Sequence, residues 1–65
     1  MTEVFRETED AVAKVIEEGR PIELPPANSY VRRVQHQIAT RYNLESQSSG
    51  KEPNRRVRIL PFGPG

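Results

Sequence analysis

His36 is the only histidine in the chain, and Arg32 stands four residues before it in the stretch NSYVRRVQHQ. On a helix, this spacing places the two side chains on one face, one turn apart. A histidine serves proteins as an acid–base catalyst, a metal ligand, a partner for an anion or an ordinary residue at the edge of a core. The rest of the sequence has to discriminate between these chemistries.

Catalytic and metal-binding roles find little support. The chain contains no cysteine, and one histidine without cysteine partners is a poor zinc site. No spacing of serine, histidine and carboxylate indicates a nucleophile triad. A histidine-driven ribonuclease normally uses a second acid–base group, and there is no second histidine. We therefore expect a non-catalytic domain with no metal and no cofactor, while a plain core-edge role for His36 stays open.

Length and composition set the scale of the protein. The 65 residues suffice for one small domain, expected at residues 1–60, with a flexible tail at residues 61–65. No apolar run approaches the roughly 18 residues of a membrane span, and the acidic N-terminus has no apolar signal region. We expect a cytoplasmic protein without membrane contacts, monomeric as an isolated domain.

Charge is divided unevenly along the chain. Residues 1–24 contain seven acids and three bases, a net charge of −4, whereas residues 25–65 contain seven bases and two acids, a net charge of +5. Many charge runs are only solvated surface, but this asymmetry is also a reason to look for a polyanionic partner of the basic part.

Hydrophobic periodicity and breaker residues divide the chain into five elements. Two are helices and three are strands, expected in chain order at residues 3–18 (helix), 21–25 (strand), 30–42 (helix), 44–48 (strand) and 55–60 (strand). Asn28 or Ser29 suits the N-cap of the second helix, and Asn43 suits a left-handed stop. The order α-β-α-β-β predicts an α+β fold, a small antiparallel sheet of about three strands with two helices packed on one face.

The apolar positions also predict the buried faces. The core side of the first helix should include Phe5 and Ile16, and the core stripe of the second should consist of Val31, Val34, Ile38 and Tyr42. Arg32 and His36 would then lie on one shoulder of that stripe. With Phe5 and Tyr42 in the core, the aromatic residues left for base stacking are Tyr30 and Phe62. This predicts low sequence specificity for any nucleic-acid ligand.

Chain geometry brings further polar groups towards Arg32 and His36. The second helix is about 20 Å long, and the next strand runs back over roughly 16–20 Å. The turn at residues 49–54 should therefore lie near the start of the helix and bring together Arg32, Arg33, His36, Lys51, Asn54 and Arg55. A helix N-terminus surrounded by arginines is suited to binding phosphate.

Three strings, LPPANSYVRRVQHQIA, YNLESQSSG and KEPNRRVRI, carry a wider pattern. An arginine four residues before a histidine is uninformative alone. Together, however, the strings resemble the R-3-H domain in its bacterial type, a family named for an arginine, three residues and a histidine. The resemblance covers about residues 22–60. It implies a compact sheet-and-two-helix domain that binds single-stranded nucleic acid and usually accompanies other domains in a longer protein.

The resemblance also implies site residues. Arg32 and His36 match the defining pair, and further basic positions of bacterial members are matched by Arg33, Arg55 and Arg56. Two positions depart from the family pattern: Asn43 stands where glycine is usual, and Gln35 where an apolar residue is common.

Two functions follow as hypotheses. The first is a non-catalytic module for single-stranded RNA or DNA, whose candidate contacts are Arg32, His36, Arg33, Arg55, Arg56, Lys51 and Asn54. Phosphate contacts would dominate, and His36 would hydrogen-bond a phosphate or stack on a base. The alternative is a protein-interaction module that uses the basic face or the edge of the first strand.

Overall fold

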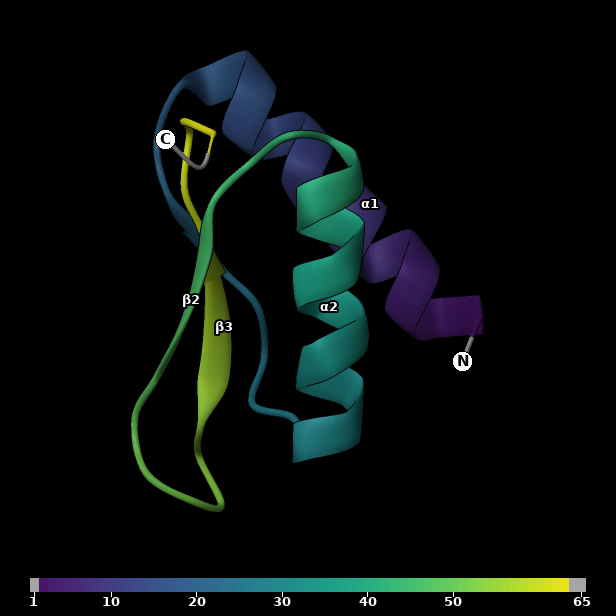
Figure 1. Ribbon diagram of the computed structural model, residues 1–65, viewed down its shortest axis with the longest axis vertical. Coiled ribbons are helices and arrows are strands. Elements are labelled where there is room, and N and C mark those ends of the chain that lie inside the picture. Colours follow the sequence, from purple (N-terminus) through teal and green to yellow (C-terminus); the bar gives the residue numbers. More distant parts are fainter. Residues whose placement is uncertain (1, 64–65) are drawn as a thin grey trace.

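The computed structural model describes residues 2–63 and contains the five expected elements in the expected order (Figure 1). They are α1 (Thr2–Glu18), β1 (Ile22–Glu23), α2 (Ser29–Arg41), β2 (Ser46–Ser49) and β3 (Arg56–Ile59). Both neighbouring strand pairs are antiparallel, and β3 lies between β1 and β2. The two helices lie on one side of this sheet (Figure 1). The predicted α+β class is confirmed.

Capping and stop residues bound the helices where the sequence predicts. The Asn28 side chain caps α2 by accepting a 2.9 Å hydrogen bond from the Val31 N–H. Asn43 adopts the left-handed conformation, with φ of 61°, just after this helix, as expected for a helix stop. Gly19 does the same after α1, with φ of 67°, and its N–H donates to the Val15 carbonyl at 2.9 Å. The start and the end of α2 are thus determined by residues of its own segment, Asn28 and Asn43.

The core lies between the helices and the inner face of the sheet. Val57 and Ile59 of β3 are fully buried, and Val12 and Val15 of α1 pack in the same cluster. The prediction that Phe5 and Ile16 are core residues is wrong, since they are 43% and 61% exposed. The sheet has three short strands, β1 only two residues long. The small sheet therefore covers only a narrow stripe of α1, and Phe5 and Ile16 at the margins of the helix's apolar face stay exposed.

The buried face of α2 differs from the predicted stripe. The buried residues are Arg32, Gln35, Ile38 and Ala39, while Val31 and Val34 are half-buried and Tyr42 is 45% exposed. At 100° per residue, the helix is rotated by roughly 60° from the orientation that hydrophobicity predicts. The rotation turns Arg32 inwards, where the loop before α2 and the β2–β3 turn supply acceptors for its guanidinium.

Gln35 is a weak point of this packing. Its side chain is only 2% exposed, and its Oε1 atom has no hydrogen-bond partner among the described residues. A buried polar group without a partner costs about 1–3 kcal/mol. We expect Gln35→Leu to raise the free energy of unfolding by about 1 kcal/mol, which is roughly 4–8 °C in Tm. Thermal and urea denaturation followed by circular dichroism measure the change.

Gln47→Leu is the matched control, since Gln47 is exposed and faces away from the helices on β2. It should change stability by less than about 0.5 kcal/mol. A loss of stability in the Gln35 variant would show that leucine does not fit the space and that the amide contributes to packing.

The chain after β3 turns back along the loop that follows α2. The carbonyl of Phe62 accepts a 2.7 Å hydrogen bond from the Glu45 N–H. A Cβ on Gly63 would stand 2.6 Å from the Asn43 carbonyl oxygen, so only glycine fits there without a shift. Residues 64 and 65 of the expected tail lie outside the described residues. Within residues 2–63, neither helix has the length and apolar character of a membrane span.

Candidate functional site

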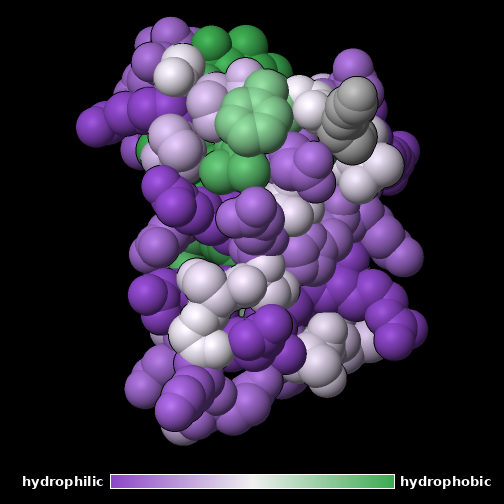
Figure 2. Space-filling model, turned by 60° about the vertical axis from the view of Figure 1, so that its left-hand side comes forward, coloured by the Kyte–Doolittle hydropathy of each residue, from purple (hydrophilic) through white to green (hydrophobic). Residues whose placement is uncertain are grey.

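An open groove of about 760 Å³ runs along α2 and is bounded on its other side by the β2–β3 hairpin. We call it the basic groove, because four of its nine lining residues are arginines and none is acidic: Arg32, Arg33, Arg41 and Arg55. His36 and four polar residues complete the lining. Hydrophilic residues also cover most of the face that Figure 2 shows, with the hydrophobic ones gathered towards one end. Exposed hydrophobic surface on this face is therefore largely confined to one end.

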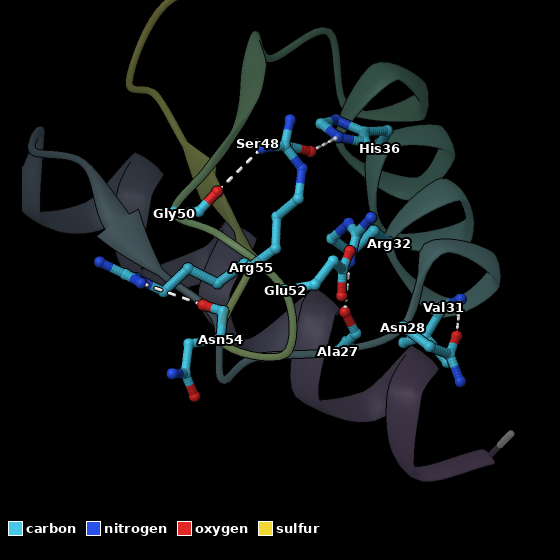
Figure 3. A network of polar contacts seen from close by, with 11 residues as sticks. Ala27, Asn28, Val31, Arg32, His36, Ser48, Gly50, Glu52, Asn54 and Arg55 are labelled. Atoms are coloured by element: carbon cyan, nitrogen blue, oxygen red, sulfur yellow. Dashed lines mark hydrogen bonds and ion pairs between the residues drawn. The ribbon is translucent and has the colours of Figure 1, made fainter.

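The predicted convergence is confirmed for four residues. Arg32, Arg33 and His36 from α2 and Arg55 from the end of the hairpin turn all line the basic groove. The turn does reach the start of α2, but the group that it brings to Arg32 is the carboxylate of Glu52 (Figure 3). Lys51 and Asn54 are exposed in this turn and are not lining residues.

Arg56 points elsewhere. Strand residues alternate between the two faces of a sheet, and Val57 next to Arg56 is fully buried on the helix side. Arg56 therefore lies on the opposite face, where its Nε is 3.1 Å from Glu23 Oε1 on β1. The structure separates Arg56 from Arg55, its neighbour in the NRRV string, because Arg55 belongs to the turn at the groove and Arg56 begins β3 with its side chain on the opposite face of the sheet.

The Arg32 side chain bridges two segments within the domain. The side chain is only 10% exposed; its Nη1 donates to the Ala27 carbonyl at 2.6 Å and forms an ion pair with Glu52 Oε1 at 2.9 Å (Figure 3). The first contact holds the loop before α2, and the second holds the hairpin turn. Arg32 thus links two segments that are distant in the sequence, and its guanidinium is already engaged within the domain.

His36 is held by β2. Its Nδ1 lies 2.5 Å from the Ser46 hydroxyl and its Nε2 lies 2.8 Å from the Ser48 hydroxyl. Alternate residues of a strand share one face, so the two serines meet both edges of the ring. Burial, and then the charge of Arg32, lowers the pKa of His36 below its ordinary value. The ring is therefore neutral near pH 7, with one nitrogen donating and the other accepting.

Arg55 is placed by the turn that precedes β3. Its Nη1 donates to the Gly50 carbonyl at 2.9 Å, which directs the guanidinium towards Ser48 and His36 (Figure 3). Gly50 has φ of 89°, and a Cβ there would lie 3.2 Å from the Asn54 carbonyl oxygen. The tight turn thus requires glycine at position 50. Because the Gly50 carbonyl accepts the Arg55 hydrogen bond, the position of the Arg55 side chain depends on this glycine.

Several lining residues escaped the sequence prediction. Ser29, Gln37, Thr40 and Arg41 lie on the groove side of α2, and Ser46 and Ser48 hold His36. A signal existed for each group. Ser29, Arg33, Gln37 and Thr40 follow one another at steps of three or four residues, which places them in one row on a helix. Ser46 and Ser48 stand at alternate positions of an extended segment.

A smaller pocket of about 250 Å³ lies beside the basic groove, between α1 and α2. We call it the interhelix pocket; it is lined by Phe5, Glu9, Ile38, Arg41 and Tyr42. The Tyr42 hydroxyl donates a 2.8 Å hydrogen bond to Glu9 Oε2. This hydrogen bond and the charge of Glu9 raise the pKa of Tyr42, so its phenol stays protonated at neutral pH.

The fold and the basic groove define a class of protein: a small α+β domain with an arginine-lined groove beside its second helix. Comparison with known sequences specifies the family. A sequence model of the R-3-H domain matches residues 3–61. The chain belongs to this family, whose domains are non-catalytic modules that generally bind single-stranded nucleic acid. Within residues 2–63, no three His, Asp or Glu side chains are grouped as a metal site would require.

Two relatives carry the same segment within much longer chains. The protein is 36% identical over 47 residues to the uncharacterized protein ycf45 of Porphyra purpurea, a match that covers 72% of this chain and 8% of the relative. It is 40% identical over 47 residues to Protein SQS1 of Podospora anserina, covering 72% of this chain and 6% of the relative. The chain thus spans less than a tenth of either relative.

Proposed function

We propose that this domain binds single-stranded RNA or DNA with low sequence preference along the basic groove, as one module of a longer protein. The observation that carries the proposal is the groove lining, which contains four arginines and no carboxylate. A strand carries one negative charge per nucleotide, and positively charged grooves follow such backbones in many single-strand binders. The bacterial type of the domain remains a prediction.

The arginines take different parts in this proposal. Arg33 and Arg41 are exposed and Arg55 is half-buried at the groove, so their N–H donors reach phosphate oxygens. Arg32 acts mainly by positioning the turn, because its Nη1 is already engaged by the Ala27 carbonyl and by Glu52. His36 has both ring nitrogens engaged by serines and offers a ligand only its ring face.

The remaining candidates are peripheral in this arrangement. Lys51 and Asn54 are exposed on the turn and would contact phosphates of the ligand beyond the end of the groove. Glu23 holds Arg56 on the opposite face of the sheet. Arg56 would therefore contact only a nucleic-acid strand that continues around the edge of the sheet. We expect alanine at these three positions to affect binding less than alanine at Arg33.

Arg33→Ala and Arg55→Ala should each weaken binding of a short single strand about fivefold at low salt, since a hydrogen bond to a charged group contributes roughly 1 kcal/mol or more. Three to four phosphate contacts predict a slope of log affinity against log salt between about −2 and −3. Each variant should flatten that slope by about 0.7. Fluorescence anisotropy over a salt series measures both quantities.

Arg58→Ala is the matched control. It removes the same charge, and Arg58 is exposed on β3 in the direction away from the helices. It should change affinity by less than about twofold. Equal losses for Arg58→Ala and Arg33→Ala would refute a groove-specific site, and absence of binding at low salt would refute the proposed function.

The alternative is a protein-interaction module that uses the basic face or the edge of the first strand, and the shortness of β1 argues against the edge. β1 has two residues and already pairs with β3 through one side. Pro21 and Pro25 flank it, and proline has no N–H to donate to an added strand. The available edge is too short for strong pairing. A protein partner whose binding depends on residues 21–25 and is unaffected by single strands would reverse this conclusion.

A further inference from the structure

The interhelix pocket holds aromatic surface that the basic groove does not use. Phe5 from α1 is 43% exposed and Tyr42 after α2 is 45% exposed. Together with Ile38 they give the pocket apolar walls. No aromatic residue lines the basic groove apart from the His36 imidazole. Tyr30 and Phe62 are also exposed, at 62% and 58%, but they line neither the basic groove nor the interhelix pocket. Of these two sites, the interhelix pocket is therefore the one that offers aromatic side chains for stacking a base.

Arg41 connects the two sites, because it lines both the basic groove and the interhelix pocket. A strand whose phosphates follow the groove along α2 reaches Arg41 at the end of the helix. A nucleotide whose phosphate contacts Arg41 would therefore lie next to the pocket.

Glu9 decides what the pocket can accept. Its Oε2 already accepts the Tyr42 hydroxyl at 2.8 Å, which holds the carboxylate in place and leaves Oε1 available. A carboxylate repels phosphate and accepts hydrogen bonds from N–H donors. Cytosine carries an amino donor at the position where thymine has a carbonyl acceptor. The carboxylate therefore attracts the cytosine edge and repels that of thymine.

We propose that the interhelix pocket is a base-binding subsite, in which Phe5 and Tyr42 stack on one nucleobase and Glu9 accepts a hydrogen bond from its exocyclic amino group. The inference rests on the proposed binding of single strands by the basic groove. It adds base discrimination to a site otherwise expected to read only phosphates. A protein side chain in the pocket is the competing occupant, but an apolar one would leave the second carboxylate oxygen of Glu9, Oε1, without a hydrogen-bond donor.

The test compares labelled oligo-dC and oligo-dT octamers by fluorescence anisotropy at low salt. The wild-type protein should bind oligo-dC about five- to tenfold more tightly than oligo-dT, the scale of one discriminating hydrogen bond to a charged group. Phe5→Ala should weaken oligo-dC binding about tenfold through lost stacking. The ring protons of Phe5 should shift in NMR spectra when oligo-dC is added.

Glu9→Gln is the decisive variant. Glutamine keeps the shape of the side chain, and its amide can accept from cytosine or donate to thymine. The ratio of the two affinities should fall to near one. Glu17→Gln, which removes the same charge from an exposed position of α1, should leave the ratio unchanged. Tyr42→Phe keeps the ring and removes the hydroxyl that orients Glu9, so it should lower the ratio without unfolding the domain.

The outcomes separate this inference from the proposed function. Equal affinities for both octamers, with Phe5→Ala neutral and Arg33→Ala weakening both, overturn the subsite and leave the basic groove intact. This result would favour a protein side chain as occupant of the pocket. Absence of binding by either octamer overturns both proposals. Preference for oligo-dC that Glu9→Gln abolishes supports the subsite.

Discussion

Replacing Arg32 by alanine is expected to lower the free energy of unfolding by about 2 kcal/mol, because the Ala27 carbonyl loses a charged donor that contributes roughly 1.5–3 kcal/mol. The Arg32 side chain is 10% exposed and links the loop before α2 to Glu52 in the hairpin turn. Glu52 is 62% exposed, so this ion pair adds less than about 1 kcal/mol. The expected fall in Tm is roughly 8–16 °C.

Thermal denaturation of Arg32→Ala beside Arg33→Ala measures the effect. The neighbouring Arg33 is exposed, so its replacement removes the same charge and should change Tm by only a few degrees. Equal Tm values for the two variants would contradict the internal role of Arg32.

The same pair of variants separates positioning from phosphate binding. If Arg32 acts through the turn, its replacement lowers affinity for a single strand but leaves the salt slope close to that of the wild-type protein. Arg33→Ala should flatten the slope by about 0.7, as loss of one phosphate contact does. Flattening by Arg32→Ala at a temperature where the variant is fully folded would show that Arg32 meets phosphate directly.

His36 should make stability depend on pH. Its pKa in the folded domain is lowered from 6.5, first by burial and then by Arg32, so the unfolded chain binds the proton more tightly. The contribution of His36 is complete above about pH 6.5 and is lost as the pH falls towards the folded-state pKa. Arg55 also lines the groove at His36, and no acidic residue does. We expect a lower Tm at about pH 5.5 than at pH 7.5.

His36→Gln supplies the control for the pH series. Glutamine does not titrate, so the Tm difference between the two pH values should shrink in the variant. The variant should also be less stable at pH 7.5 by about 1 kcal/mol, since one or both bonds to Ser46 and Ser48 are weakened. An unchanged pH dependence would assign it to the carboxylates and not to His36.

The predictions that held depend on local signals. The order of elements, the hairpin, the Asn28 cap and the Asn43 stop each follow from residues within a few positions of one another. Burial of Val57 and Ile59 follows from alternation along one strand. Such features require no knowledge of what packs against them.

The predictions that failed concern the rotation and coverage of elements. Hydrophobicity placed Val31, Val34 and Tyr42 inwards, whereas the structure buries Arg32 and Gln35 there. A polar group can be buried when an acceptor awaits it, and the acceptors for Arg32 come from residues 27 and 52, in other segments. Likewise, Phe5 and Tyr42 stay outside because the sheet is too narrow to cover them.

The family, the fold class and the residues from which a basic site can be built all follow from the sequence, because spacing, capping and charge are written along the chain. The parts that these residues play follow only from the folded arrangement. It engages Arg32 within the domain, holds His36 between two serines, turns Arg56 to the opposite face and joins Arg41 to an aromatic pocket. These outcomes depend on which segments meet in space, and partners so distant in the chain leave no local pattern.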